Sequence, residues 1–179
     1  MKPIFLIGFM GTGKTTLGRA LVAMEEVNVT FVDLDEHIES HFGMPVKEIF
    51  RRHGEAAFRD YESQALRELG AQSDIIVGCG GGTPCQAGNM EWMNNHGVTV
   101  VLRASHEALL RRLLEAQAQR PLLNGMDAEQ LSAFIDAKQA EREPFYGKAQ
   151  MEFDSDLLET PEDVAESCRK FLAMVRSWE

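Results

Sequence analysis

A glycine-rich segment near the N-terminus constrains this chain more than any other feature. Residues 8–16 read Gly-Phe-Met-Gly-Thr-Gly-Lys-Thr-Thr, which fits the pattern G-x-x-x-x-G-K-[ST]. An apolar run precedes the segment and leucines at helical spacing follow it, so it joins a predicted strand to a predicted helix. In that setting backbone N–H groups and the helix N-terminus cradle phosphate oxygens. We therefore predict a nucleoside triphosphate site that includes Gly11, Thr12, Gly13, Lys14, Thr15 and Thr16.

Two side chains of this segment have specific expected roles. Lys14 is expected to reach the β- and γ-phosphates and to stabilise the transition state, and the Thr15 hydroxyl to bind Mg²⁺. The motif alone does not separate a kinase from a GTPase or an ATPase. The chain contains neither an Asn-Lys-x-Asp sequence nor a long apolar strand ending in Asp-Glu. A small-molecule kinase is therefore favoured over a GTPase or a large ATPase.

Short apolar runs alternate with helical stretches along the rest of the chain. Strands separated by helices imply a parallel sheet with helices on both faces. We predict strands at 4–7, 27–32, 75–77, 98–102 and 151–153, and helices at 15–26, 36–42, 46–69, 89–95, 107–117, 127–143 and from 160 onward. Pro144 is expected to end the sixth helix, and Thr160-Pro161-Glu162 to cap and open the last one.

This pattern predicts an α/β protein of one domain, residues 1–179. Its expected architecture is the three-layer P-loop NTPase fold with a five-stranded parallel sheet. Two polar insertions rich in helix-breaking residues stand out, at about 34–62 and about 115–127. In an open α/β fold, excursions beyond the strand ends are where ligand sites and lids lie. We expect the first insertion to bind a substrate and the second to form a lid.

Composition limits the partners of the chain. With 28 acidic and 18 basic residues its net charge is −10, which opposes binding to nucleic acid or to an anionic membrane. No stretch of 18 apolar residues occurs, and glycines interrupt the N-terminal apolar run too early for a signal peptide. Cys79, Cys85 and Cys168 are few and lack C-x-x-C spacing, which indicates reduced thiols in a cytoplasmic protein.

An acidic pair follows the second predicted strand, which ends Val32-Asp33-Leu34-Asp35. Side chains two residues apart on an extended strand point to the same side, so both carboxylates are expected to face one way. Acidic groups beside a triphosphate repel it unless they serve Mg²⁺ or a neutral polyol. We therefore place Asp33 near the metal, through water, and Asp35 on a substrate hydroxyl.

Five motifs, in order along nearly the whole chain, resemble those of the shikimate kinase family. Residues 8–16 resemble its phosphate loop, and residues 33–39, Gly43, 48–50 and 54–62 its substrate-binding segment; Gly80-Gly81-Gly82 match its triple glycine, Arg120-Pro121-Leu122-Leu123 its lid, and Arg142-Glu143-Pro144-Phe145-Tyr146 its late arginine motif. Together these motifs are far more specific than the phosphate loop alone.

The resemblance implies ATP-dependent phosphorylation of shikimate at its 3-hydroxyl, on the pathway to chorismate and the aromatic amino acids. Shikimate carries one carboxylate, which Arg59 and Arg142 can hold by bidentate charge-assisted bonds. Asp35 can accept a hydrogen bond from the reacting hydroxyl and take its proton. Glu62 can hold Arg59 as an i,i+3 partner. The backbones of Gly80, Gly81 and Gly82 can approach the substrate closely.

The resemblance also implies roles on the nucleotide side and an oligomeric state. Arg120 is expected to reach the phosphates when the lid closes and excludes water. Arg112 is a weaker candidate for an adenine contact, and Arg111 remains an alternative to it. Residues 154–161 are expected to line the far side of the adenine pocket. Together with the lack of an obvious exposed apolar helix, the family fold favours a monomer.

Two alternatives remain open at this point. One is another small P-loop kinase, acting on gluconate or on a nucleotide. A nucleotide kinase would need a different lid and a second base pocket, and the triple glycine combined with Arg142-x-Pro-x-Tyr146 favours shikimate over gluconate. The other is a binding module that holds ATP and signals without turnover. Every expected catalytic position is occupied, which disfavours this second alternative.

Overall fold

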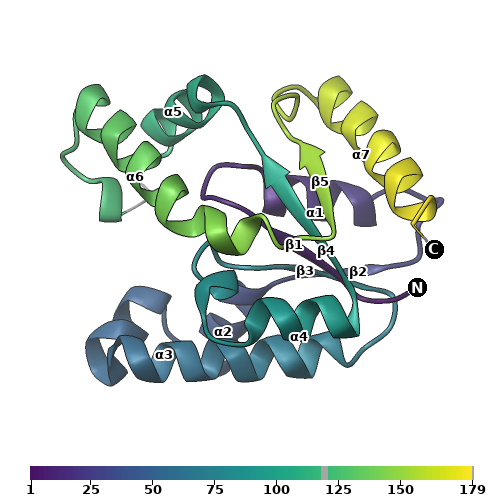
Figure 1. The fold of residues 1–179 in the computed structure, drawn as a ribbon, viewed down its shortest axis with the longest axis horizontal. Coiled ribbons are helices and arrows are strands. Elements are labelled where there is room, and N and C mark those ends of the chain that lie inside the picture. The colour runs from purple at the N-terminus through teal and green to yellow at the C-terminus, as the bar shows by residue number, and fades with distance from the viewer. Residues whose placement is uncertain (118–120, 179) are drawn as a thin grey trace.

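The computed structural model describes residues 1–117 and 121–178, and its centre is one parallel sheet (Figure 1). The strand order is β2-β3-β1-β4-β5. The strands are β1 (Ile4–Ile7), β2 (Thr30–Asp33), β3 (Ile75–Gly78), β4 (Val98–Arg103) and β5 (Met151–Asp154). The sheet and its strand count agree with the predicted fold class.

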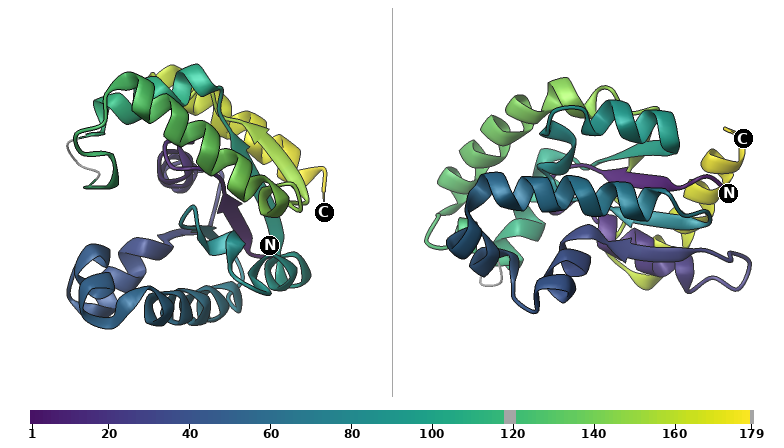
Figure 2. Two further views of the ribbon diagram at one scale, coloured as in Figure 1. Left: turned by 60° about the vertical axis from the view of Figure 1, so that its left-hand side comes forward. Right: turned by 90° about the horizontal axis from the view of Figure 1, so that it is seen from below.

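Helices cover both faces of the sheet, which gives three layers (Figures 1 and 2). Along β1, Phe5 and Ile7 belong to the apolar cluster of one face, and Ile4 and Leu6 to that of the other. The first cluster takes in residues of five helices: α2 (Leu34–Phe42), α3 (Val46–Gly70), α4 (Asn89–His96), α5 (His106–Glu115) and α6 (Ala128–Tyr146). The second takes in α1 (Lys14–Val22) and α7 (Pro161–Arg176). Strands buried on both faces account for the apolar runs in the sequence.

The strand register brings the functional segments to one edge of the sheet. Asp33 of β2 pairs with Gly78 of β3, and Leu6 of β1 also pairs with Gly78. The segments that leave β1, β2 and β3 therefore start side by side at the carboxyl edge, where open α/β sheets bind ligands.

The end of α1 and the start of β2 differ from prediction because of local hydrogen bonding. α1 ends at Val22, because Met24 N–H donates to Leu21 and Val27 N–H to Met24, a run of i→i−3 bonds that closes the helix. β2 starts at Thr30 rather than at residue 27, because its partner β3 begins only at Ile75, which is paired with Thr30.

Two predictions about helix breakers are wrong. Pro144 lies inside α6, which continues to Tyr146 because Arg103 bonds Glu143 and Tyr146 is anchored to Gly81. A proline near a helix C-terminus removes a hydrogen bond, and here tertiary contacts outweigh that loss. Conversely, the predicted continuous helix over 46–69 is kinked at Gly54, whose φ of 83° and ψ of 167° are not helical.

Other helix features follow the sequence closely. Thr160 caps α7 in a reciprocal capping box with Asp163, and Pro161 occupies the first turn, as predicted. The short 3₁₀ turn η1 (Thr83–Cys85) follows the triple glycine, and a second one, η3 (Pro121–Leu123), precedes α6. Across residues 1–117 and 121–178, none of the helices has the length and apolarity needed to cross a membrane.

Candidate active site

The glycine-rich segment forms the turn from β1 into α1, as its motif predicts. Gly13 is the N-cap of α1 with a φ of 87°, a left-handed conformation that other residues rarely adopt, and no side chain caps the helix. The N-terminus of α1 therefore keeps its backbone N–H groups and positive dipole end for an anion. The Lys14 ammonium donates to the carbonyls of Gly8 at 2.8 Å and Phe9 at 2.9 Å, which holds it over the loop.

A cleft of about 530 Å³ opens beside this loop. It is lined by residues of the phosphate loop (Met10, Gly11, Gly13, Lys14, Thr15, Thr16), by Asp33 and Asp35, by Cys79, Gly80 and Gly81, and by Arg112, Leu113, Glu115, Ala116, Leu158 and Glu159. Segments from five places in the sequence thus share one cavity. A phosphate donor and a second small molecule can meet there.

Of the six loop residues predicted to bind the nucleotide, Thr12 is the one that does not line this cleft. It is buried, and its hydroxyl donates to the Phe9 carbonyl at 2.8 Å. The side chain therefore stabilises the loop from inside. That Thr12 contacts the nucleotide stays a prediction, and such a contact would be made by its backbone.

Thr15 and Asp33 meet in the lining of the cleft. The Thr15 hydroxyl donates to Asp33 Oδ2 at 2.8 Å, while Asp33 Oδ1 accepts from the N–H groups of Asp35 and Glu36 and so caps α2. A hydroxyl and a carboxylate at this spacing form a set of oxygen donors of the kind that Mg²⁺ prefers. Among the described residues no group of three His, Cys, Asp or Glu side chains could hold a metal, so phosphate oxygens and water would complete the shell. The residues present fit Mg²⁺ bound to a nucleotide.

Asp35 lies in the cleft as predicted, but for a different geometric reason. Asp33 ends β2 and caps α2, so Asp35 sits in the first turn of that helix. The prediction that both carboxylates project from an extended strand end is therefore wrong. Burial raises the pKa of Asp35 to about 6, and the negative charges of Glu62 and Asp33 contribute to the rise, against the lowering effect of Lys14 and Arg59. A carboxylate with a pKa near neutrality can accept a proton during a reaction.

The triple glycine, of which Gly80 and Gly81 line the cleft, also runs alongside Arg59 and Arg142, which adjoin the cleft without being part of its lining. A Cβ added at Gly81 would lie 2.6 Å from Arg142 Nη1, and one at Gly82 would lie 2.9 Å from Arg59 Nη2. A Cβ at Gly80 would lie 3.2 Å from Asp35 Oδ1. The absence of a side chain at these three positions lets the charged groups lie against the backbone. Arg59 comes from α3 and Arg142 from α6, so the fold joins residues that are far apart in the sequence.

The expected ion pair between Arg59 and Glu62 is present. Glu62 is 1% exposed, and its Oε2 accepts from Arg59 Nη1 at 2.9 Å. The guanidinium also lies over the rings of Phe58 and Phe50, at 5.3 and 5.8 Å from their centroids. Arg59 is therefore held by a buried charge on one side and by aromatic rings on the other.

The two arginines have unsatisfied donors. In the described part of the chain, Arg59 Nε and Arg142 Nη1 are the two buried side-chain nitrogen or oxygen atoms that lack a hydrogen-bond partner. A buried cationic donor without a partner is costly, and native proteins keep such atoms where a ligand completes them. An anionic group of a ligand would do so here.

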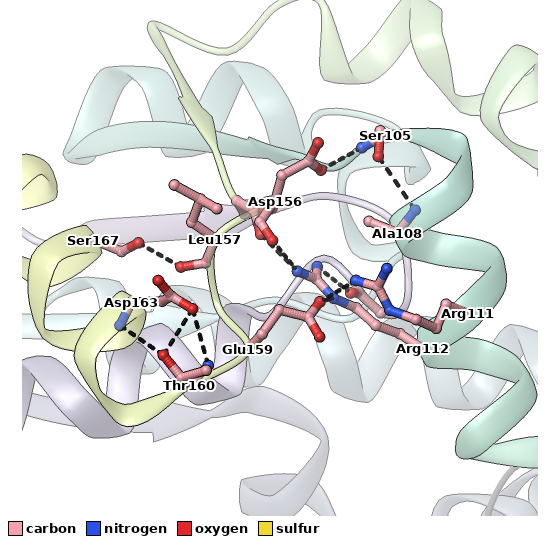
Figure 3. A network of polar contacts seen from close by, with 12 residues as sticks. Ser105, Ala108, Arg111, Arg112, Asp156, Leu157, Glu159, Thr160, Asp163 and Ser167 are labelled. Atoms are coloured by element: carbon pink, nitrogen blue, oxygen red, sulfur yellow. Dashed lines mark hydrogen bonds and ion pairs between the residues drawn. The ribbon is translucent and has the colours of Figure 1, made fainter.

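Arg112 and Arg111 differ in what they hold (Figure 3). Arg112 bonds the carbonyls of Gly11 at 3.2 Å, Ser155 at 2.9 Å and Asp156 at 2.8 Å, and so links the phosphate loop to the loop after β5. Arg111 is about half exposed and pairs with Glu159. Since Arg112 lines the cleft, it is the better placed of the two for a nucleotide contact.

Arg120, the expected arginine of the lid, falls within 118–120, outside the described residues. Its role stays a prediction. Two residues that the motif analysis gave no role also touch the site: Tyr146 donates to the Gly81 carbonyl at 2.7 Å, and Thr83 donates to Glu62. Their signal in the sequence is adjacency to the triple glycine and to the late arginine motif.

A phosphate loop that lines the cleft, a carboxylate of raised pKa in the same cleft and two adjoining arginines with unpartnered buried donors are the features of a P-loop phosphotransferase for a small acceptor. The family model of shikimate kinase (SKI) matches residues 10–173. A shikimate kinase of Parabacteroides distasonis is 43% identical over 164 residues, which cover 92% of this chain and 94% of the relative.

Solved structures of shikimate kinases are also similar to this chain. A shikimate kinase structure from Bacteroides thetaiotaomicron superposes with a TM-score of 0.92 at 41% identity, covering 97% of this chain and 98% of the other. A shikimate kinase from Acinetobacter baumannii in complex with shikimate gives a TM-score of 0.82 at 28% identity, covering 100% and 95%. The chain belongs to the shikimate kinase family, whose members are ATP-dependent phosphotransferases with an alcohol group as acceptor.

Proposed function

We propose that the protein transfers the γ-phosphoryl group of ATP to the 3-hydroxyl of shikimate, giving shikimate 3-phosphate and ADP. This reaction lies on the pathway to chorismate and the aromatic amino acids. The acceptor oxygen forms a bond to the γ-phosphorus as the bond from that phosphorus to the leaving oxygen of ADP breaks. The hydroxyl proton passes to Asp35.

The observation that carries this proposal is the pair of unpartnered arginine nitrogens. Arg59 Nε and Arg142 Nη1 are both buried, and both guanidinium groups lie against the triple glycine, as does the Asp35 carboxylate. A single carboxylate with two oxygens can accept from both guanidinium groups. Shikimate offers that carboxylate at one end of its ring and hydroxyl groups for Asp35 at the other. Gluconate also has a carboxylate, but its open chain would lose more conformational entropy on binding.

On the nucleotide side, catalysis is mainly positioning and positive charge. Lys14 leaves the carbonyls that it holds and binds the β- and γ-phosphates, which also receive N–H groups of the loop from Gly11 to Thr16. Mg²⁺, held by Thr15 directly and by Asp33 through water, supplies charge neutralisation when bound. Arg112 contacts the adenine, and Arg120 adds charge at the phosphates.

Two segments serve the single domain that we assign to residues 1–179. Residues of about 34–62 form the acceptor-binding segment, which contributes Asp35, Arg59 and the supporting Glu62. Residues of about 115–127 form a lid that excludes water. In support of this, the Gln117 amide donates to the carbonyls of Leu123 at 2.6 Å and Met126 at 2.7 Å, which ties the ends of the segment together.

We further propose a monomer in the cytoplasm whose partners are ATP and shikimate, without nucleic acid or membrane. The net charge of −10 supports the last point. All three cysteines are free thiols, which suits a reducing compartment. Size-exclusion chromatography with light scattering tests the monomer.

A coupled ADP-release assay tests the function. Purified protein receives Mg²⁺ and ATP with shikimate, quinate, gluconate, AMP or no acceptor. We expect release that depends on shikimate and that is abolished by EDTA and restored by Mg²⁺. Release with gluconate or AMP alone would contradict the assigned acceptor, and ATP binding without release for any acceptor would favour a binding module.

A further inference from the structure

Thr83 occupies a position that the reaction as described above does not use. It is the first residue of η1, directly after the triple glycine, and it is fully buried. Its hydroxyl donates to Glu62 Oε1 at 2.6 Å. A buried hydroxyl that donates to a buried carboxylate makes a strong, charge-assisted bond.

Glu62 divides its two oxygens between Thr83 and Arg59. Oε1 accepts from the Thr83 hydroxyl, and Oε2 accepts from Arg59 Nη1 at 2.9 Å. Because Glu62 is 1% exposed, water cannot replace either donor without rearrangement. The Thr83 bond thus restricts the rotation of the carboxylate. The carboxylate, together with the Phe50 and Phe58 rings and a longer contact of 3.6 Å with the exposed Glu55, restricts the orientation of the Arg59 guanidinium.

We propose that Thr83 is a positioning residue for the acceptor: through Glu62 it sets the orientation in which Arg59 presents its unpartnered Nε to the substrate carboxylate. This inference rests on the proposed function. Removal of the hydroxyl frees Glu62 Oε1, the carboxylate rotates towards another donor, and Arg59 loses the alignment needed for a bidentate contact.

The backbone of Thr83 is held independently of its hydroxyl. Its N–H donates to the Gly80 carbonyl at 3.1 Å, and its carbonyl accepts from Asn89 Nδ2 at 2.9 Å. Asn89 is itself buried and also donates to Ser63 Oγ at 3.2 Å. A substitution that removes only the hydroxyl therefore leaves the triple-glycine turn anchored, which makes the role of the hydroxyl separable from that of the turn.

Thr83→Val and Thr83→Ser test the proposal. Valine keeps the shape and removes the hydroxyl, whereas serine keeps the hydroxyl and removes a buried methyl group. We expect Thr83→Val to raise the KM for shikimate about 10-fold, as for loss of a hydrogen bond to a charged group, with the KM for ATP within about 2-fold. Thr83→Ser is expected to restore the KM for shikimate, although it loses stability through the missing methyl group.

Thr99→Val is the matched control. Thr99 is also fully buried and its hydroxyl also donates to a side chain, Asn94 Oδ1 at 2.5 Å, but it lies on β4 outside the cleft. It is expected to lower the melting temperature without changing either KM. Thr83→Ala serves as a second hydroxyl-free variant if valine prevents folding.

Three results overturn the proposal: a KM for shikimate at the wild-type value in Thr83→Val or Thr83→Ala, equal impairment of Thr83→Ser and Thr83→Val, or equal increases in both KM values. Wild-type protein in the same assay distinguishes failure of the proposed function from failure of the role assigned to Thr83. If it shows no shikimate-dependent release, the proposed function fails and the role of Thr83 with it. If it is active and the hydroxyl-free variants match it, only the role of Thr83 fails.

Discussion

The two halves of the proposed site, the nucleotide half in the cleft and the acceptor half that adjoins it, are built in contrasting ways. The nucleotide half comes mainly from one continuous segment, residues 8–16, in which we propose that backbone groups and a helix N-terminus bind the phosphates. The acceptor half is assembled from side chains of α2, α3 and α6 around the triple glycine. In the first half Lys14 holds carbonyl groups of its own loop, and in the second Arg59 and Arg142 each have a buried donor without a partner. Local geometry makes the first half robust, while the second depends on tertiary packing.

Lys14→Ala removes the charge on which the nucleotide half depends and carries the largest expected effect. Turnover should fall about 10³-fold or more, because the positive charge acts on the transition state. Steady-state kinetics in the ADP-release assay measures this loss. Lys170→Ala, which removes an exposed lysine of α7, is the control and should keep full activity. Turnover near the wild-type rate in Lys14→Ala would contradict the role of the ammonium.

Asp35→Asn tests the proton acceptor where the two halves meet. Turnover should fall about 10²- to 10³-fold, in the range of general base catalysis. Because the pKa of Asp35 is about 6, wild-type turnover should also decline as the pH falls through 6. A profile that stays flat down to pH 5 would argue against Asp35 as the base.

The stability of Asp35→Asn should rise, although its turnover should fall. The raised pKa means that the folded state binds the proton more tightly than the unfolded state, so ionised Asp35 destabilises the fold above about pH 6. This cost is relieved as the pH falls from 6 towards 4. The amide that replaces the carboxylate carries no charge, so Asp35→Asn should raise the free energy of unfolding at pH 7, at most on the order of 3 kcal/mol.

Asp33→Ala should change stability in the opposite direction to Asp35→Asn. Asp33 caps α2, and its loss should lower stability by about 1 kcal/mol. Urea unfolding at pH 7 measures both variants. Equal destabilisation by Asp33→Ala and Asp35→Asn would contradict the different environments assigned to the two carboxylates.

Arg142→Ala should weaken the acceptor half alone. Loss of a charge-assisted bidentate contact is expected to lower shikimate affinity about 10- to 100-fold, with ATP affinity little changed. Arg142→Lys should recover only part of the affinity, because an ammonium group cannot form the paired contact. Isothermal titration with each ligand separates the effects, and a collapse of ATP affinity would show that Arg142 is misplaced in our assignment.

Gly81→Ala tests the acceptor half without replacing a charged residue. The new Cβ would lie 2.6 Å from Arg142 Nη1, so the guanidinium must shift while the backbone φ remains acceptable. The KM for shikimate should rise about 10-fold, since small misplacements of binding groups are costly. Gly147→Ala, whose Cβ would meet only the Glu143 carbonyl at 3.2 Å and its carboxylate at 3.5 Å, controls for the general effect of alanine. An unchanged KM in Gly81→Ala would mean that Arg142 relocates freely.

The same contrast explains how far the sequence predicts this molecule. The phosphate loop, the five strands and the helix cap at Thr160 depend on neighbours in the chain, and they are predictable from spacing and residue type alone. Asp35 was placed in the right cleft for the wrong reason, because the strand-to-helix boundary depends on Asp33 accepting from two N–H groups. Pro144 was predicted to end a helix that Arg103 and Gly81 hold together from other elements.

The acceptor half was predictable only through its resemblance to a known family. Nothing in the spacing of Arg59 and Arg142 indicates that they meet, since α3 and α6 come together through packing on the same face of the sheet. Thr83 and Tyr146 were missed for the same reason. Their partners, Glu62 and Gly81, lie 21 and 65 residues away in the chain.

Glu159→Gln carries the smallest expected effect and probes the outer rim of the nucleotide half. Glu159 pairs with Arg111 at 2.6 Å and Arg112 at 3.0 Å, but it is 38% exposed. Arg112 would still hold three backbone carbonyls after the change. We therefore expect the KM for ATP to rise by no more than about 5-fold, as for a surface ion pair, with the KM for shikimate unchanged.

Glu166→Gln, which breaks an exposed pair on α7, is the matched control for this variant. If Glu159 acts only through its charge, its removal should instead lower the KM for ATP, because a negative group beside the polyphosphate is lost. A rise therefore indicates that Glu159 orients the arginines, and a fall indicates that it merely repels the nucleotide. Repeating the measurement at high salt separates these two effects, since salt screens repulsion at an exposed site more strongly than it disturbs the carbonyl contacts of Arg112, whose side chain is 15% exposed.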